Sequence, residues 1–132
     1  MAKHLAIFVG DYIKQILSGT KTIEVRLSQE KIVPYGAIAK GDEILLKKSG
    51  REILGAVEVD NVLFYENLTP ELIGRIRKEY NKELNVDNNF WQAKANSRYA
   101  SLIFLKNPRR FLAPMKFRKK DRRPWVIIDK NN

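Results

Sequence analysis

The feature of the sequence that most constrains the fold is a glycine turn followed at once by a strand pattern, in residues 19–27 (GTKTIEVRL). Side chains alternate between the two faces of a strand, so one face here is expected to be apolar and the other polar. The apolar set is Ile23, Val25 and Leu27, and the polar set is Thr22, Glu24 and Arg26. Lys21 stands at the mouth of the strand, where the turn can free its side chain from the alternation. This short segment therefore concentrates a carboxylate, a guanidinium, an ammonium and a hydroxyl.

The residues before this segment predict a strand and a helix. Residues 5–9 are a continuous apolar run, which is typical of a buried strand. Asp11 is placed to cap a helix expected over residues 12–18, because its carboxylate can accept from unpaired N–H groups. Gly19 suits the left-handed backbone that ends many helices. The opening of the chain is thus expected to be strand, helix, glycine turn and strand.

The remainder of the chain predicts further short elements and one small domain spanning residues 1–132. Thr69 followed by Pro70 predicts a helix start, Gly55 predicts a bulge or a close approach, and Pro108 is expected to end a strand. The expected strands cover residues 43–48, 52–63, 98–105 and 125–128, and the expected helices cover residues 70–84 and 90–95. Five or six strands with two or three helices predict an α+β domain built around a small, partly closed β-barrel.

Positive charge is concentrated in one segment. The chain has a net charge of +10, of which residues 106–123 contribute +8. Such a cluster on a nearly neutral body predicts a face that binds a polyanion, with nucleic acid as the expected partner. The apolar residues between or beside these charges are expected to anchor the segment to the body, and a solvated loop is the alternative. These residues are Phe111, Leu112, Met115, Phe117 and Trp125. The predicted nucleic-acid-binding residues are Arg109, Arg110, Lys116, Arg118, Lys119, Lys120, Arg122 and Arg123.

Composition excludes several other classes of function. The absence of cysteine excludes disulfides, thiolate nucleophiles and thiolate metal sites, and it suits a cytoplasmic location. No apolar run is long enough for a signal-peptide core or a membrane span. The acidic residues lack the spacing of a metal-ligand set, so neither metal nor cofactor is expected. His4 has no partner pattern and is interpreted as incidental.

Residues 19–26 resemble the Gly-x-Lys-x-x-Glu-x-Arg signature of ASCH domains, members of the PUA-like superfamily. The Lys-Gly-Asp turn at residues 40–42, Arg98-Tyr99 and a tryptophan near the C-terminus agree with this resemblance, which covers roughly residues 4–128. The resemblance implies a PUA-like β-barrel flanked by helices, with a cleft built on the signature residues. It also implies an association with RNA or with a modified nucleoside.

Two activities of similar proteins are alternatives to simple binding. Some small ASCH proteins are amidohydrolases acting on N4-acetylcytidine, with a lysine and, three positions later, a threonine. Lys21 matches that lysine, but Glu24 occupies the threonine position, which favours recognition over that hydrolysis. Other ASCH proteins are ribonucleases acting on single-stranded RNA, and only Lys21 transfers to that activity. A protein–protein adaptor is a third possibility.

The polar residues of the signature predict a site. Arg26 is expected to orient Glu24 through paired hydrogen bonds, Glu24 to accept from the exocyclic amine of a base, and Lys21 to meet a phosphate or oxyanion. A salt-bridged surface strip is the plain alternative. Tyr35, Phe90, Trp91 and Tyr99 are candidates for stacking on a base; Trp91 is the best of them, although a core position is its stronger expectation. The predicted ligand-binding residues are Lys21, Thr22, Glu24, Arg26, Trp91, Ser97 and Arg98, with Lys21 and Glu24 catalytic if the protein is an enzyme.

Overall fold

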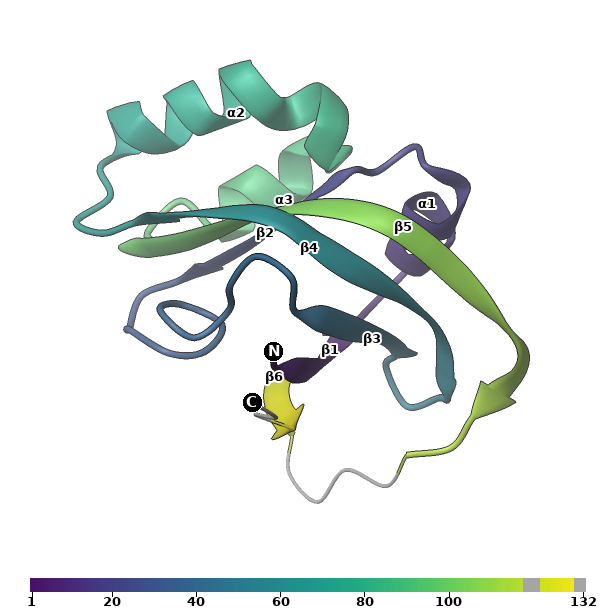
Figure 1. Cartoon of the computed structure of the whole chain (residues 1–132). Coiled ribbons are helices and arrows are strands. Elements are labelled where there is room, and N and C mark those ends of the chain that lie inside the picture. The colour runs from purple at the N-terminus through teal and green to yellow at the C-terminus, as the bar shows by residue number, and fades with distance from the viewer. Residues whose placement is uncertain (118–121, 130–132) are drawn as a thin grey trace.

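The strands form a single curled sheet in the order β2-β5-β4-β3-β1-β6 (Figure 1). The computed structural model describes residues 1–117 and 122–129. Strands β1 and β3 are parallel, and the other neighbouring strands are antiparallel. The strands are β1 (Lys3–Phe8), β2 (Ile23–Ser28), β3 (Glu43–Lys48), β4 (Ile53–Tyr65), β5 (Tyr99–Met115) and β6 (Trp125–Asp129). The helices are α1 (Tyr12–Ser18), α2 (Pro70–Leu84) and α3 (Asn88–Ala93).

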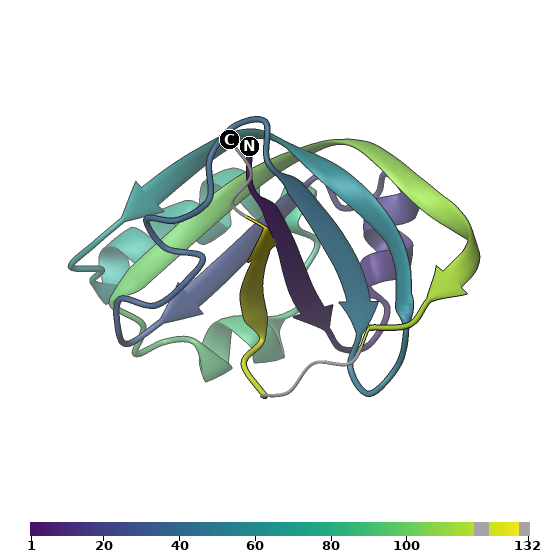
Figure 2. The same ribbon diagram turned by 60° about the horizontal axis from the view of Figure 1, so that its bottom comes forward.

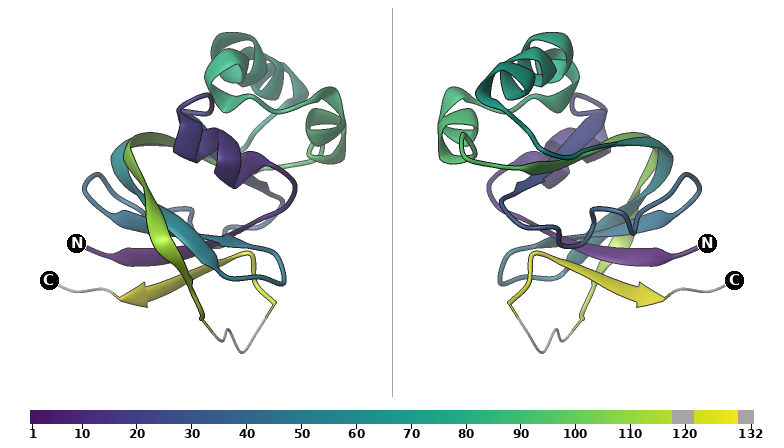
Figure 3. Two further views of the ribbon diagram at one scale, coloured as in Figure 1. Left: turned by 90° about the vertical axis from the view of Figure 1, so that its right-hand side faces the viewer. Right: turned by 90° about the vertical axis from the view of Figure 1, so that its left-hand side faces the viewer.

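The sheet bends into a half-barrel whose two edge strands, β2 and β6, are not hydrogen-bonded to each other (Figure 2). Helices α2 and α3 pack over β2 and the first part of β5, on one side of the molecule. Strands β1 and β6 form the opposite side of the half-barrel (Figure 3). The predicted α+β domain with a small, partly open barrel is confirmed. No helix in the described part of the chain is long and apolar enough to cross a membrane.

Capping and turn residues place the elements that flank the site. Gly19 adopts φ 85°, and its N–H donates to the carbonyls of Gln15 and Ile16, so it ends α1 as expected. Thr69 accepts from the N–H of Leu72 at the start of α2. Asp11 stands at the start of α1, but its side chain makes no capping hydrogen bond, so that part of the prediction is wrong.

Two apolar clusters build most of the core. One joins α1 to β1, β3 and β4, and it includes Trp125 of β6. The other lies between the sheet and helices α2 and α3, and it receives Ile23, Val25 and Leu27 from β2. The predicted alternation along this strand is therefore confirmed. It leaves Glu24 and Arg26 on the face turned away from the second cluster.

Strand β5 continues well past the proline that was expected to end it. Pro108 lies where the pairing of β4 with β5 shifts register, between the Glu58–Lys106 and Ala56–Arg109 pairs. Asn107 has φ 52°, which marks a bulge in the strand. A proline is tolerated at a bulge because no ladder hydrogen bond is needed from its nitrogen. The expectation that Pro108 terminates the strand is wrong for this reason.

His4 is a buried structural residue, which corrects its interpretation as incidental. Its side chain is fully buried, and Nε2 lies 2.8 Å from Oδ2 of Asp42. The indole N–H of Trp125 donates to Nδ1 of His4 at 3.0 Å. Because an indole nitrogen can only donate, Nδ1 must accept, and Nε2 carries the proton that it donates to Asp42. This chain of hydrogen bonds links β1, the turn before β3 and β6.

Candidate functional site

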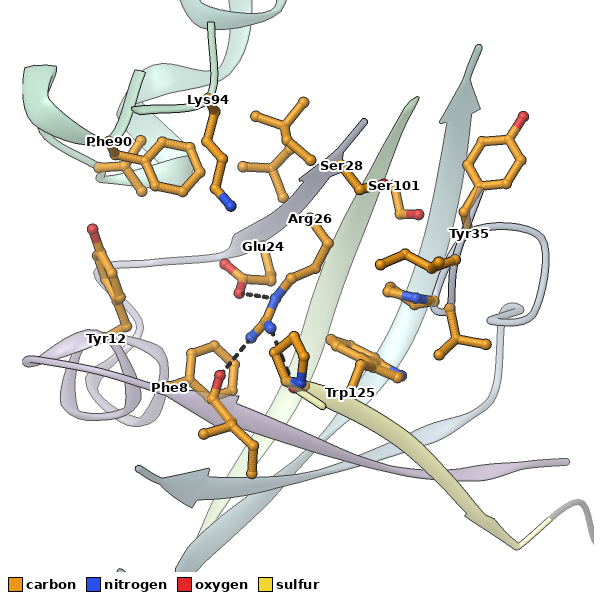
Figure 4. A pocket seen from close by; sticks show the side chains of 18 of the residues that line it. Phe8, Tyr12, Glu24, Arg26, Ser28, Tyr35, Phe90, Lys94, Ser101 and Trp125 are labelled. Carbon is orange, nitrogen blue, oxygen red and sulfur yellow. Dashed lines mark hydrogen bonds and ion pairs between the residues drawn. The ribbon is translucent and has the colours of Figure 1, made fainter. Parts of the chain in front are cut away.

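A pocket of about 290 Å³ opens between β2, the end of β1, the residues before β6 and helix α3 (Figure 4). It lies where the half-barrel is unclosed, on the polar face of β2. Its lining is mainly apolar and aromatic, with few polar groups. The aromatic side chains are those of Phe8, Tyr12, Tyr35, Phe90 and Trp125, and the polar ones are those of Glu24, Arg26, Ser28, Lys94 and Ser101.

Arg26 crosses the open side of the half-barrel. Its Nη2 donates to the carbonyl of Ile7 at 3.0 Å and its Nη1 to the carbonyl of Pro124 at 3.4 Å. The guanidinium lies 4.8 Å from the ring centroid of Phe8 and 5.0 Å from that of Trp125. Arg26 therefore ties β2 to β1 and to the start of β6, and it forms one wall of the pocket.

Glu24 is held as a carboxylate between two cations. Nε of Arg26 donates to Oε2 of Glu24 at 2.9 Å, and the ammonium of Lys21 lies 3.2 Å from Oε1. Burial acts to raise the pKa of Glu24, but Lys21 and Arg26 outweigh it, so the pKa is lowered. The expected pair of hydrogen bonds from Arg26 to Glu24 is wrong, because the guanidinium uses only Nε there and its other nitrogens reach backbone carbonyls.

Ser101 supplies an unpartnered hydroxyl to the pocket. It lies on β5 opposite Arg26 in the pairing of β2 with β5. The residue is 1% exposed, and its Oγ has no hydrogen-bond partner among the described residues. A buried hydroxyl without a partner has lost its hydrogen bonds to water and gained none within the protein, so such groups are exceptional in native proteins. A ligand atom in the pocket would satisfy it.

The aromatic walls are fixed by their neighbours. The ring of Tyr35 packs against Phe64 at 5.1 Å and edge-on against Tyr99 at 5.2 Å between centroids.

Across the pocket, burial and the carboxylates of Asp87 and Glu24 raise the pKa of Tyr12, so its phenol remains a donor. Flat side chains on opposite walls suit a flat, aromatic ligand.

Lys94, which follows the last residue of α3, extends its ammonium over the pocket toward Glu24 and Arg26 (Figure 4). The side chain is half-buried. Within the described part of the chain, its ammonium makes neither a hydrogen bond nor an ion pair. Phe90 lies one helical turn earlier and lines the same pocket.

The structure brings only part of the predicted ligand-binding set to the pocket. Glu24 and Arg26 line it, whereas Lys21 lies behind Glu24, is 1% exposed, and donates to the carbonyl of Leu84. That placement gives no support to the expected contact of Lys21 with a phosphate. The four other predicted residues do not line the pocket: Thr22, Trp91, Ser97 and Arg98.

Two of these four residues are buried outside the pocket and two are exposed. Trp91 is 4% exposed in the core cluster under α2, and its indole N–H donates to Oδ1 of Asn81. Ser97 is buried in the turn before β5, while Thr22 and Arg98 are exposed. The core position that the sequence favoured for Trp91 is the one found.

The described residues of the predicted basic face lie on β5 and in the segments that follow β5 and precede β6. Arg109 pairs with Glu43 at 2.7 Å, and its neighbour Arg110 is exposed on the far part of β5. Arg122 and Arg123 are exposed immediately before Pro124, which lines the pocket. Lys116 is exposed after β5, and Arg118, Lys119 and Lys120 lie outside the described residues.

The apolar anchors expected in this segment are only partly found. Phe111 and Phe117 pack against a third apolar cluster, formed by β1, β3 and β4. Leu112 and Met115 are instead exposed, at 108% and 42%. Trp125, the fifth expected anchor, is 1% exposed in the first apolar cluster. The expected anchoring is thus correct for the two phenylalanines and Trp125 and wrong for Leu112 and Met115.

Sequence reasoning missed Ser101 and Lys94 as site residues. The available signal for Ser101 was a lone hydroxyl within the apolar run of residues 100–105, on the strand that pairs with β2. Lys94 gave no signal of its own, because its role depends on where α3 sits over the sheet. Tyr35 and Phe90 were among the stacking candidates, and both line the pocket.

Comparison with known proteins identifies the family. The family model of the ASCH domain matches residues 8–114. The chain belongs to the ASCH family. Its fold is similar to that of an ASCH protein from Zymomonas mobilis, with a TM-score of 0.76 at 13% identity over 98% of this chain and 89% of that one. The expected membership of the ASCH family is therefore confirmed.

Further solved structures extend this likeness. A serine-to-alanine variant of the Zymomonas mobilis ASCH protein has a TM-score of 0.76 at 12% identity, covering 98% of this chain and 89% of that one. A hypothetical protein has a TM-score of 0.55 at 22% identity, covering 82% of this chain and 99% of that one. At these identities the likeness establishes the shared fold alone. A search of curated proteins found no match.

Proposed function

We propose that this ASCH domain binds RNA by accepting one nucleobase, plain or modified, in the pocket between β2 and α3. The observation that carries the proposal is the buried, unpartnered hydroxyl of Ser101 inside a pocket with aromatic walls. A volume of about 290 Å³ is near the lower end of the range of ~300–1,000 Å³ typical of small-molecule sites. A site of this size suits a single nucleoside.

The polar groups of the pocket match the edge of a base. A base presents both donors and acceptors on its edge, and the hydroxyl of Ser101 can act as either. Each carboxylate oxygen of Glu24 keeps a lone pair after bonding to Lys21 or Arg26, so Glu24 can accept from an exocyclic amine. Tyr35 and Phe90 offer ring faces or edges for stacking.

The state of Glu24 favours recognition over acid–base catalysis. An efficient general acid or base has a pKa near the working pH, whereas the pKa of Glu24 is lowered by its two cations. Glu24 is therefore a persistent acceptor and a weak proton carrier. Hydrolysis of RNA or of an acetylated cytidine by Lys21 and Glu24 remains the second candidate, because both groups are buried directly beside the pocket.

Calorimetric titration with the four ribonucleosides, N4-acetylcytidine and single-stranded RNA oligonucleotides tests the proposal. Ser101→Val fills space and removes the hydroxyl, so we expect it to abolish nucleoside binding; Ser101→Ala should weaken it by about tenfold. Ser49→Ala, in the exposed turn between β3 and β4, is the matched control. Equal affinity of wild type and Ser101→Val for every ligand would refute the pocket as the site.

The hydrolase alternative is tested in the same samples. Mass spectrometry of the RNA and of N4-acetylcytidine after incubation reports any turnover, with Lys21→Met as the variant. Turnover by wild type that Lys21→Met abolishes would establish an enzyme. Binding without turnover would establish a recognition domain.

A further inference from the structure

The charges of the pocket are unbalanced. Its lining includes one carboxylate, that of Glu24, and two cations, those of Arg26 and Lys94. A third cation, Lys21, lies behind Glu24. Glu24 is already shared between Lys21 and Arg26, so the described part of the chain leaves Lys94 without a counterion.

The excess charge is directed at the space where a ligand would lie. The ammonium of Lys94 points over the pocket toward Glu24 and Arg26, as Figure 4 shows. Nη1 of Arg26 lies 3.4 Å from the carbonyl of Pro124, a long hydrogen bond that a better acceptor can replace. Two cations from different elements thus face the same pocket, and an anion between them would gain charge-assisted hydrogen bonds from both.

We propose, on the basis of the function proposed above, that the site binds a nucleotide rather than a nucleoside, with its phosphate held by Lys94 and Nη1 of Arg26. The base then occupies the end of the pocket at Ser101, on the strand opposite Arg26. A phosphate is the natural anion, because every nucleotide of RNA carries one and a lysine binds it as a point charge. Lys94 is in this view a specificity residue that contacts the ligand.

The phosphate can come from two sources. In a mononucleotide or at a strand end it is a terminal group, and within RNA it is a bridging diester. Both present oxygens to a lysine, but only the first carries close to two negative charges. Comparing mononucleotides with dinucleotides that lack a terminal phosphate therefore distinguishes a reader of strand ends from a reader of internal positions.

The experiment measures dissociation constants for matched ligand pairs. Each ribonucleoside is titrated beside its 5′- and 3′-monophosphate and beside a dinucleotide with no terminal phosphate. The proteins are wild type, Lys94→Gln, Lys94→Arg and a control, Lys78→Gln, which removes one exposed lysine of α2 outside the pocket. Thermal unfolding of each variant verifies that it is folded.

The expected result has three parts. Wild type binds at least one monophosphate about tenfold or more tightly than its nucleoside, a ratio typical of one charge-assisted hydrogen bond. Lys94→Gln brings this ratio of affinities close to one, and Lys94→Arg keeps most of it. The ratio also declines at higher salt because the ammonium is only half-buried.

Three outcomes overturn the inference. Equal affinities of wild type for nucleoside and phosphorylated ligands would show that the phosphate is not read, while leaving the nucleobase pocket in place. An equal loss of the preference for the monophosphate over the nucleoside in Lys78→Gln and Lys94→Gln would show that this preference comes from the general charge of the protein. No binding of nucleoside, nucleotide or oligonucleotide would overturn the proposed function itself.

Discussion

Nη2 of Arg26 donates to the backbone carbonyl of Ile7 at 3.0 Å, and this hydrogen bond joins the edge strand β2 to β1 across the open side of the half-barrel. The same guanidinium reaches the carbonyl of Pro124, before the other edge strand, and lies against the ring of Trp125. The arginine of the ASCH signature therefore connects the two edges of the half-barrel and also forms one wall of the pocket. Its hydrogen bonds to Glu24, Ile7 and Pro124 depend together on the fork geometry that only a guanidinium provides.

Replacing Arg26 by lysine is expected to destabilise the fold. A lysine keeps the charge, but it cannot reach Glu24, Ile7 and Pro124 together. We expect a loss of about 2–4 kcal/mol in the free energy of unfolding, measured by urea denaturation. Arg98→Lys, at an exposed residue before β5, should change it by less than about 0.5 kcal/mol. Similar stabilities of the two variants would mean that Arg26 does not close the barrel.

Gly55 and Gly74 predict opposite effects of the same substitution. A Cβ at Gly55 would lie 2.4 Å from the carbonyl oxygen of Arg109 and 3.0 Å from Leu17, so Gly55→Ala must push two strands apart. We expect it to destabilise the protein by about 1–3 kcal/mol. Gly74 is an exposed residue inside α2 with nothing near its absent Cβ, and Gly74→Ala should stabilise by about 0.5–1 kcal/mol. Chemical denaturation of both variants measures the difference, and a shared sign would contradict this geometry.

Two buried carboxylates predict a loss of stability in acid. Burial acts to raise the pKa of Asp42, but hydrogen bonds from His4, Ala2 and Ala39 outweigh it and hold the pKa below 3.8. The pKa of Glu24 is likewise below its ordinary value of 4.5. Because both carboxyls bind protons more weakly in the folded state, their contribution is complete above the ordinary values and is lost as the pH falls through the lowered ones.

The variant Asp42→Asn tests this pH dependence. At neutral pH we expect it to cost about 1.5–3 kcal/mol, because charge-assisted hydrogen bonds to His4 and to two backbone N–H groups are weakened. The cost should shrink as the pH is lowered from about 5 toward 2, since wild type then loses the same charge. Urea denaturation across that range measures it, with Glu66→Gln as an exposed control. A cost independent of pH would contradict the role of the Asp42 charge.

The sequence predicted local structure well where one residue decides it. Gly19 ends α1 because of its backbone freedom, Thr69 and Pro70 start α2, and the alternation of β2 places Glu24 beside Arg26. Gly55 was expected to mark a bulge or a close approach, and it does both. The features at Gly19, Thr69 and β2 depend on neighbours in the sequence, whereas the close approach at Gly55 is to Arg109 of another strand and was signalled only by the glycine itself.

The site itself depended on contacts between distant residues, which is why much of it could not be predicted. Ser101 becomes a pocket residue only through the register of β2 with β5, and His4 becomes a core residue only through Asp42 and Trp125. Lys21 was assigned to the ligand because it matches the lysine of the ASCH signature beside a carboxylate. Its ammonium is instead engaged by the carbonyl at the end of α2.

RNA binding as a polymer is expected to depend on the cations next to the pocket as well as on the pocket. Arg122 and Arg123 are exposed directly before Pro124, so a strand with one base in the pocket would pass close to them. Reversing the charge of Lys119, Lys120, Arg122 and Arg123 should weaken binding of single-stranded RNA. It should also lower the slope of log K against log salt, by up to about 3, because each lost phosphate contact contributes about 0.7.

The control for this variant reverses four exposed cations elsewhere: Lys40, Lys48, Arg51 and Lys78. Both variants change the net charge of the chain equally, so a general electrostatic attraction would weaken both alike. Fluorescence anisotropy with a labelled oligonucleotide, repeated at several salt concentrations, gives the affinity and the slope together. We expect the slope to fall only in the first variant, while its affinity for a mononucleotide stays within about threefold, because the pocket residues are unchanged. An unchanged slope would remove these four residues from the RNA interface.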